Sequence, residues 1–131
     1  MENNSIFGEA DLIHVYTRKE ALEDGTLFDV SATAREAGFL IPVALTAALH
    51  ADVADLSGRH VTAGQDARGR LWDLLVLARF NAAKPENADT SEYIFELCMP
   101  VGEEQKYSAK AMVGPGDDEQ PVLTLLRPTE D

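Results

Sequence analysis

The longest apolar run of the chain, RLWDLLVLARF at residues 70–80, constrains the fold more than any other stretch. Eight of its eleven residues are apolar, and helical spacing spreads them around most of the circumference. A helix that is apolar on nearly every side is buried, and eleven residues are too few to span a bilayer. We therefore predict a central core helix, with Trp72 as its largest anchor and with Arg70 and Asp73 paired on its one polar edge.

The composition is that of one soluble domain. A chain of 131 residues with 45% hydrophobic residues can bury a core without disulfides or metals. Cys98 is the only cysteine, which excludes an internal disulfide and a Cys/His metal cluster. We expect a single domain over residues 1–131 with a flexible segment at 1–11. Because no basic region followed by an apolar one begins the sequence, we also expect a cytoplasmic protein.

The first half of the chain predicts helices and short extended pieces. Extended segments are expected at 12–16 and 27–30. Thr17 and Glu20 form a capping box for a helix that ends at Asp24 and Gly25. Ser31 is expected to cap the next helix and Gly38 to end it. Pro42 suits the first turn of a further helix over 42–56.

The second half changes to a period of two, which is typical of strands at 93–99, 107–113 and 121–126. Helices followed by a meander predict an α+β fold, with helices packed on one face of a C-terminal three-stranded antiparallel sheet. The residues expected in its core are Leu45, Leu49, Leu71, Trp72, Leu75, Phe95, Leu97, Ala109 and Leu125.

The charge of the chain is strongly negative and unevenly distributed. The formal net charge is −12, and residues 85–131 hold eleven acidic residues against three basic ones. Such a field repels nucleic acid and attracts basic protein surfaces, although acidity can also serve solubility alone. We expect the partner to be a basic surface of a host protein or nucleoprotein complex, with no direct nucleic-acid binding and no membrane contact. The residues expected to bind it form two acidic tips at opposite ends of the meander: Glu103, Glu104, Asp117, Asp118 and Glu119.

Motifs for catalysis or for a cofactor are missing from the sequence. His14, His50 and His60 are far apart and lack metal-ligand spacing, and no G-x-S-x-G, P-loop or dinucleotide-binding pattern occurs. Cys98 has no neighbouring histidine and is interpreted as a structural thiol. The loop 114–119 has carboxylates that suit a hard cation, but its spacing is not that of an EF-hand and favours an acidic hairpin tip. We therefore predict no catalytic residue, metal or cofactor.

Three blocks of sequence carry a resemblance. They read YTRKEALEDGTLFDV, GQDARGRLWDLL and GPGDDEQPVLT, and in this order they resemble a small plasmid- and phage-borne bacterial family of unknown function. The resemblance implies a single-domain protein of a mobile genetic element without an established activity, and it assigns no catalytic residue. The motif positions whose role stays open are Arg18, Asp24, Asp29, Gln65, Asp66, Arg70 and Asp73.

Three hypotheses of function follow, in this order. The first is an interaction protein that inhibits a host component, such as an anti-CRISPR protein whose carboxylates occupy a basic nucleic-acid channel. The second is an oligomeric module, a monomer or homodimer that pairs through an exposed sheet edge. The third is an enzyme for an anionic small molecule, with Arg18 binding the anion and Asp29, Asp73 or His60 as acid or base.

Overall fold

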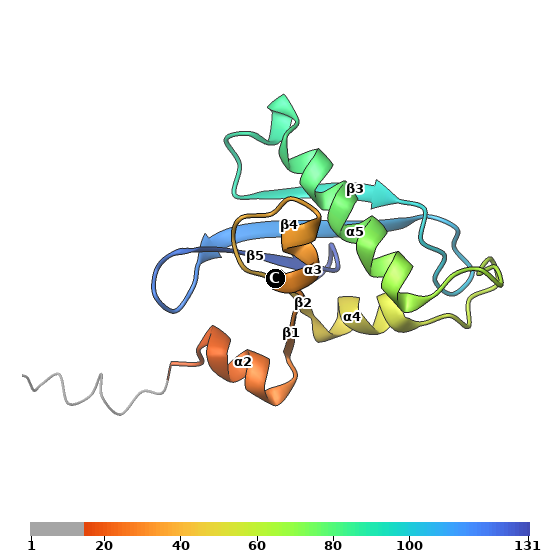
Figure 1. Cartoon of the computed structure of the whole chain (residues 1–131), viewed down its shortest axis with the longest axis horizontal. Helices are drawn as coiled ribbons and strands as arrows, with labels where there is room; N and C mark the ends of the chain where they lie inside the picture. Colours follow the sequence, from red (N-terminus) through yellow and green to blue (C-terminus); the bar gives the residue numbers. More distant parts are fainter. Residues whose placement is uncertain (1–14) are drawn as a thin grey trace, which may run out of the picture.

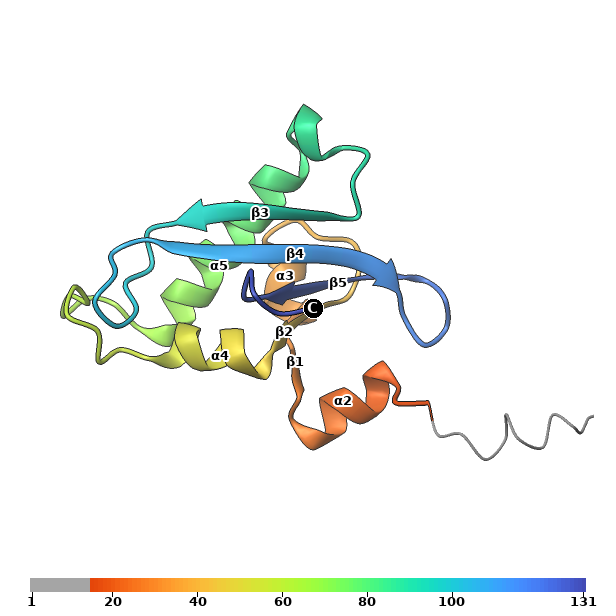
Figure 2. The ribbon, with the colours of Figure 1, turned by 180° about the vertical axis from the view of Figure 1, so that it is seen from behind.

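A computed structural model describes residues 15–131 and contains a five-stranded mixed sheet in the order β1-β2-β5-β4-β3. Figure 1 looks onto the face that α3 and α5 cover, and Figure 2 onto the opposite face. The elements are α2 (Arg18–Asp24), β1 (Leu27–Asp29), α3 (Ser31–Glu36), β2 (Val43–Thr46), α4 (Ala47–Ala54), α5 (Ala67–Ala82), the 3-10 turn η1 (Pro85–Asn87), β3 (Glu92–Leu97), β4 (Tyr107–Pro115) and β5 (Pro121–Leu126).

The α+β class and the C-terminal meander are confirmed. Strands β3 and β4 pair antiparallel, as do β4 and β5. The sheet nevertheless continues beyond the predicted three strands, because β5 pairs in parallel with β2 and β2 pairs antiparallel with β1. The helices also differ from the prediction, since α2 borders the face of the sheet opposite to the one that α3, α4 and α5 cover.

The predicted helix over 42–56 is wrong in its first turn. Residues 43–46 form β2, and α4 begins only at Ala47. Val43, Ala44 and Leu45 are all buried, so both faces of the strand are covered and no period of two is visible in the sequence. The side chain of Thr46 then caps α4 by accepting the backbone N–H of Leu49 at 3.3 Å.

The helix ends were predicted with mixed success. The capping box of Thr17 and Glu20 is confirmed, and Gly25 has the left-handed conformation expected of it, with φ 84°. Ser31 is not a cap, because it is the first residue of α3 and its hydroxyl accepts the backbone N–H of Val43 at 3.0 Å. The extended segment expected at 12–16 is not a strand at residues 15 and 16, and residues 12–14 lie outside the described part, as does the segment 1–11.

Helix α5 lies at the centre of the fold, as predicted, but it is covered on one side only. Its Leu74, Leu75 and Ala78 are buried against the sheet, whereas Trp72 and Phe80 are 39% and 63% exposed. The prediction that Trp72 is the main anchor of the helix in the core is therefore wrong. Leu71, which was also expected in the core, is only partly buried against it. The core residues confirmed as buried are Leu45, Leu49, Leu75, Phe95, Leu97, Ala109 and Leu125. Among residues 15–131, no helix is both long and apolar enough to cross a membrane.

Arg70 is buried inside the molecule, with 4% of its surface exposed. Its Nε donates to the carbonyl of Val53 at 2.9 Å, and one terminal nitrogen donates to the carbonyl of Asp52 at 2.9 Å. The other terminal nitrogen donates to the carbonyl of Pro100 at 2.7 Å and to Oε1 of Gln65 at 3.3 Å. One side chain thus connects the end of α4, the start of α5 and the connection between β3 and β4.

The predicted pairing of Arg70 with Asp73 on a polar helix edge is wrong, because the guanidinium turns inward and Asp73 stays exposed. Burial lowers the pKa of Arg70, and the charges of Asp55 and Asp52 oppose this shift. Arginine stays protonated in proteins despite such shifts. The carbonyl groups around it therefore solvate a buried positive charge.

We predict that Arg70→Met lowers the free energy of unfolding by about 3 kcal/mol, because it leaves buried carbonyl groups without donors. Arg68→Met on the same helix is the matched control, since Arg68 is exposed, and it should change stability by less than about 0.5 kcal/mol. Urea unfolding followed by circular dichroism measures both. Equal effects of the two substitutions would contradict the structural role of Arg70.

Candidate functional site

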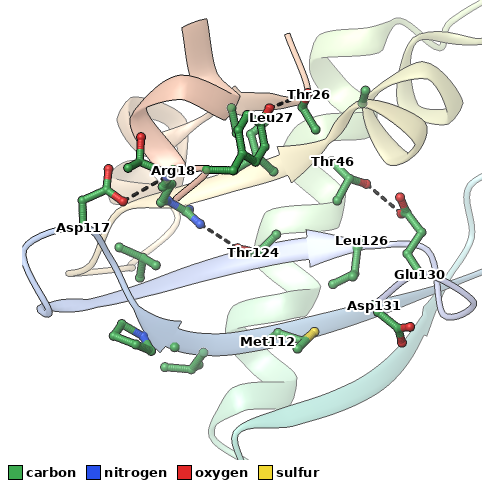
Figure 3. Close-up of a pocket in the computed structure, with 18 of the residues that line it drawn as sticks. Arg18, Thr26, Leu27, Thr46, Met112, Asp117, Thr124, Leu126, Glu130 and Asp131 are labelled. Atoms are coloured by element: carbon green, nitrogen blue, oxygen red, sulfur yellow. Dashed lines mark hydrogen bonds between the residues drawn. The ribbon is translucent and has the colours of Figure 1, made fainter. Parts of the chain in front are cut away.

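A cleft of about 800 Å³ lies on the sheet face opposite α3 and α5, between α2 and the C-terminal residues Glu130 and Asp131 (Figure 3). Its floor is apolar and comes from three strands: Leu27 of β1, Met112 of β4 and Leu126 of β5. Hydroxyl groups and charged side chains lie around this floor. The labelled polar residues are Arg18, Thr26, Thr46, Asp117, Thr124, Glu130 and Asp131.

Arg18 extends from the first turn of α2 toward β5. One terminal nitrogen donates to the hydroxyl oxygen of Thr124 at 2.7 Å, and the other donates to the carbonyl of Leu123 at 3.0 Å. Burial lowers the pKa of Arg18, while the nearby carboxylates of Asp29 and Asp117 act in the opposite direction. The side chain therefore joins α2 to the sheet and leaves part of its guanidinium in the cleft.

Asp117 holds the N-terminus of α2, although it lies in the turn between β4 and β5. Its Oδ1 accepts the backbone N–H of Arg18 and its Oδ2 accepts that of Lys19, both at 2.9 Å. A carboxylate at a helix N-terminus satisfies free N–H groups and complements the helix dipole. The first and the last sequence block of the resemblance thus meet at this contact.

The two aspartates of the first block shape turns. Asp24 accepts the hydroxyl of Tyr16 at 2.5 Å and that of Thr26 at 2.7 Å, and the hydrogen bonds from Thr26 and Tyr16 lower the pKa of Asp24. Asp29 accepts the backbone N–H of Ser31 at 2.9 Å, and the hydrogen bonds from Ser31 are the main cause of its lowered pKa. Both contacts are local and exposed.

The middle block lies around Arg70, away from the cleft. Asp66 is the N-cap of α5 and accepts a backbone N–H of its first turn at 2.7 Å. Gln65 accepts a hydrogen bond from Arg70 at 3.3 Å. Asp73 and Cys98 border a separate small cavity of about 170 Å³ beside these residues. The seven motif positions therefore divide between two regions, and only Arg18 of them lines the large cleft.

The residues proposed for acid or base catalysis are not brought together. Asp29 is hydrogen bonded to Ser31, Asp73 borders the other cavity, and His60 contacts Gln105 with 3.2 Å between Nδ1 and Nε2. None of the three lines the cleft that contains Arg18. Arg18 thus lacks the acid or base that the enzyme hypothesis gave it.

The remaining histidines and the cysteine show no common site. The ring of His50 stacks on Phe28, with 3.8 Å between the ring centroids, and His14 lies outside the described residues. Cys98 is an exposed free thiol. Within residues 15–131, no group of three or more His, Cys, Asp or Glu side chains is arranged to hold a metal ion.

The acidic tips lie at opposite ends of β4. Glu103 and Glu104 are exposed in the connection from β3, and Glu103 lies 3.7 Å from the guanidinium of Arg59. At the other end, Asp118 accepts the backbone N–H of Gln120 at 3.0 Å. Glu119 is exposed there and has a positive φ of 67°. Except for Asp117, the tips keep their carboxylates at the surface.

A cluster of Asp52, Tyr107 and Arg127 was missed by the sequence analysis. Arg127 donates to both carboxylate oxygens of Asp52, each at 2.8 Å, and the hydroxyl of Tyr107 donates to the same carboxylate. Burial and the hydrogen bond to Asp52 raise the pKa of Tyr107, and Asp52 raises that of Arg127. Residues from α4, β4 and the C-terminal segment meet here, and no spacing in the sequence indicates this contact.

The structure defines an α+β protein with a mixed sheet and a cleft that Arg18 borders. The chain belongs to a family of unknown function, DUF6573, which it matches over residues 1–131. This confirms the resemblance to a family without an assigned activity, while the plasmid and phage origin stays a prediction. No curated protein and no solved structure matches the chain.

We predict that Asp117→Asn lowers the free energy of unfolding by about 1 kcal/mol, because the amide keeps one acceptor oxygen and loses the charge at the N-terminus of α2. Asp118→Asn is the matched control in the same turn and should have a smaller effect. Urea unfolding measures both. If the order of the two variants were reversed, the cap formed by Asp117 would contribute little.

Stability should fall at alkaline pH because of one buried and one partly buried tyrosine. Burial raises the pKa of Tyr93 from 10.0 to about 12, and that of Tyr107 is raised as well. Above pH 10 the unfolded chain loses these protons first, so the stability present below pH 10 is lost as the pH rises through about 12. We expect the free energy of unfolding to fall less steeply with pH in Tyr93→Phe than in the unaltered chain, in unfolding curves recorded between pH 10 and about pH 12. The same slope in both proteins would contradict the raised pKa of Tyr93.

Proposed function

We propose that the chain is a non-enzymatic acidic protein that binds and inhibits a host protein or nucleoprotein complex through a basic surface of that partner. An inhibitor of a cytoplasmic host defence complex, such as an anti-CRISPR protein, is one concrete form of this function. The expected origin of the family in plasmids and phages, itself a prediction, motivates this form. The distribution of charge supports the binding itself.

The observation that supports the proposal most is the burial and pairing of the three basic residues in 85–131. Lys110 is 8% exposed and donates its ammonium group to the carbonyl of Glu130. Arg127 is paired with Asp52 although 43% of its side chain is exposed, and Lys106 is the most exposed of the three. The exposed acidic residues of the same region are Glu86, Asp89, Glu92, Glu96, Glu103, Glu104, Asp117, Asp118, Glu119 and Asp131.

The exposed side chains of residues 85–131 resemble a nucleic acid in one respect. Many of them are negatively charged, and few positive charges lie among them. Nucleic-acid-binding channels gain most of their affinity from Lys and Arg side chains that neutralise phosphates. A folded surface of carboxylates can occupy the same side chains, and its field also accelerates the encounter. Direct binding to nucleic acid is disfavoured by the same charge.

A second candidate function is the binding of a small anionic molecule in the cleft that Arg18 borders. The partly buried guanidinium and the apolar floor favour it. The carboxylates of Asp117, Glu130 and Asp131 around the same cleft oppose an anion. We therefore place this candidate second.

The test is affinity capture from a bacterial host lysate with the tagged chain, washed at low and then at moderate salt and read by mass spectrometry. We expect a complex that handles nucleic acid, and we expect salt to remove it. Glu103→Gln with Glu104→Gln, or Asp118→Asn with Glu119→Gln, should each reduce capture by about two- to fivefold, since exposed charge pairs contribute about 0.2–1 kcal/mol each.

The matched control is Glu36→Gln with Asp73→Asn, because these two carboxylates are exposed on α3 and α5 and border no cavity together with an acidic tip. It removes the same charge and should leave capture nearly unchanged. If capture fails at low salt, or if the control lowers it as much as the tip variants do, the proposed function is wrong.

A further inference from the structure

Strand β3 is one of the two edge strands of the sheet, opposite β1, and one side of its backbone is unpaired within the described residues. In residues 15–131 it pairs only with β4, from Glu92 opposite Met112 to Leu97 opposite Tyr107. The backbone N–H of Val113 donates to the carbonyl of Ser91 at 2.7 Å. In an antiparallel pair of strands, every second residue forms backbone hydrogen bonds to the neighbouring strand. Because residue 91 does so, residues 93, 95 and 97 form the other hydrogen bonds to β4.

The backbone groups of the alternate residues, Glu92, Ile94 and Glu96, consequently point away from the sheet. Figures 1 and 2 show β3 at its margin in both views. The strand runs for six residues without a proline and keeps a continuous register with β4. Very short strands, prolines, bulges and edge charges protect an edge from pairing with another chain, and of these β3 has only the charges of Glu92 and Glu96.

The side chains on the open face of β3 have a defined pattern. Ile94 is 60% exposed, and exposed carboxylates flank it at Glu92 and Glu96. The residues directly opposite them on β4 are Met112 and Ser108, and Lys110, opposite Ile94, donates its ammonium group to the carbonyl of Glu130. An added strand would bind more tightly if it placed a basic side chain opposite each glutamate and an apolar side chain opposite Ile94.

A second copy of the chain does not fit this edge. Antiparallel pairing of two β3 strands centred on Ile94 would place Glu92 opposite Glu96 of the other copy, twice. Like charges directly opposite each other destabilise a strand pair, and each copy also has a net charge of −12. The pattern therefore favours a basic strand of a different protein over a homodimer.

We propose that β3 binds an extended segment of a partner protein as an additional strand, in which basic, apolar and basic side chains alternate on one face. The inference rests on the proposed function, because it assumes a basic protein as the partner. Backbone hydrogen bonds to Glu92, Ile94 and Glu96 provide the affinity, and their side chains provide the specificity. The acidic tips then attract the partner from a distance, while β3 forms the contact.

The experiment titrates the full chain with the labelled peptide acetyl-Thr-Lys-Thr-Val-Thr-Lys-Thr-amide and follows fluorescence anisotropy. Its two lysines and its valine share one face of a strand. The control peptide, acetyl-Thr-Lys-Lys-Val-Thr-Thr-Thr-amide, has the same composition and charge without the alternation. We expect only the alternating peptide to bind, and Glu92→Gln with Glu96→Gln should weaken it about tenfold. Glu103→Gln with Glu104→Gln should leave it unchanged.

Ile94→Pro tests the backbone directly. The N–H of Ile94 points away from β4, so proline is tolerated there as on other edge strands, yet it blocks an added strand and should abolish binding. Circular dichroism checks its fold, and if the variant is unfolded, the comparison of the two glutamate pairs decides.

Equal binding of both peptides, binding that survives Ile94→Pro in a folded protein, or no binding at all overturns the inference. A dimer of the free chain in light scattering would also overturn it. These outcomes are independent of the lysate capture, so failure of the edge contact and failure of the proposed function are distinguishable.

Discussion

The buried guanidinium of Arg70 is the contact on which the arrangement of the fold depends. It donates to carbonyl groups at the end of α4 and in the connection between β3 and β4, while its own backbone belongs to α5. The N–H of Arg59 closes the same junction by donating to the carbonyl of Gly102 at 2.9 Å. A Cβ atom on Gly58 would lie 3.1 Å from the backbone of Gly102, so the two loops pack without room for a side chain. The junction fixes the orientation of α5 over the sheet, and with it the core.

Several polar residues of the three sequence blocks have a structural role. Arg70 and Asp66 hold α5, and Asp117 holds α2. Because these side chains are engaged in backbone contacts, they are poor candidates for chemistry on a ligand. Arg18 is the exception, since it faces the cleft while it also binds β5. The carboxylates that stay at the surface lie mainly on the β3–β5 part of the sheet, and this division is the basis of the proposed function.

Periodicity and capping chemistry predicted the local structure well. The apolar run of α5, the capping box at Thr17 and the alternation in β3 are local signals, and the structure confirms all three. Strand β2 was not predicted, because a short strand that is buried on both faces has no hydrophobic period in its sequence. The burial of Trp72 was predicted wrongly, because the sequence of a helix that is apolar on all sides does not indicate which side packs against the core. The site was less predictable. Asp117 caps a helix 99 residues away and Arg127 meets Asp52 across 75 residues, so only the assembled fold reveals either contact.

The motif residue Arg70 holds the fold, and we propose that the acidic surface binds the partner. The most direct test compares lysate capture by Arg70→Met and by the unaltered chain, each divided by its folded fraction from circular dichroism. We expect equal capture for each folded molecule, because Arg70 is buried and has little surface to offer a partner. A variant that stays folded but no longer captures the partner would contradict it and would place Arg70 in the binding function itself.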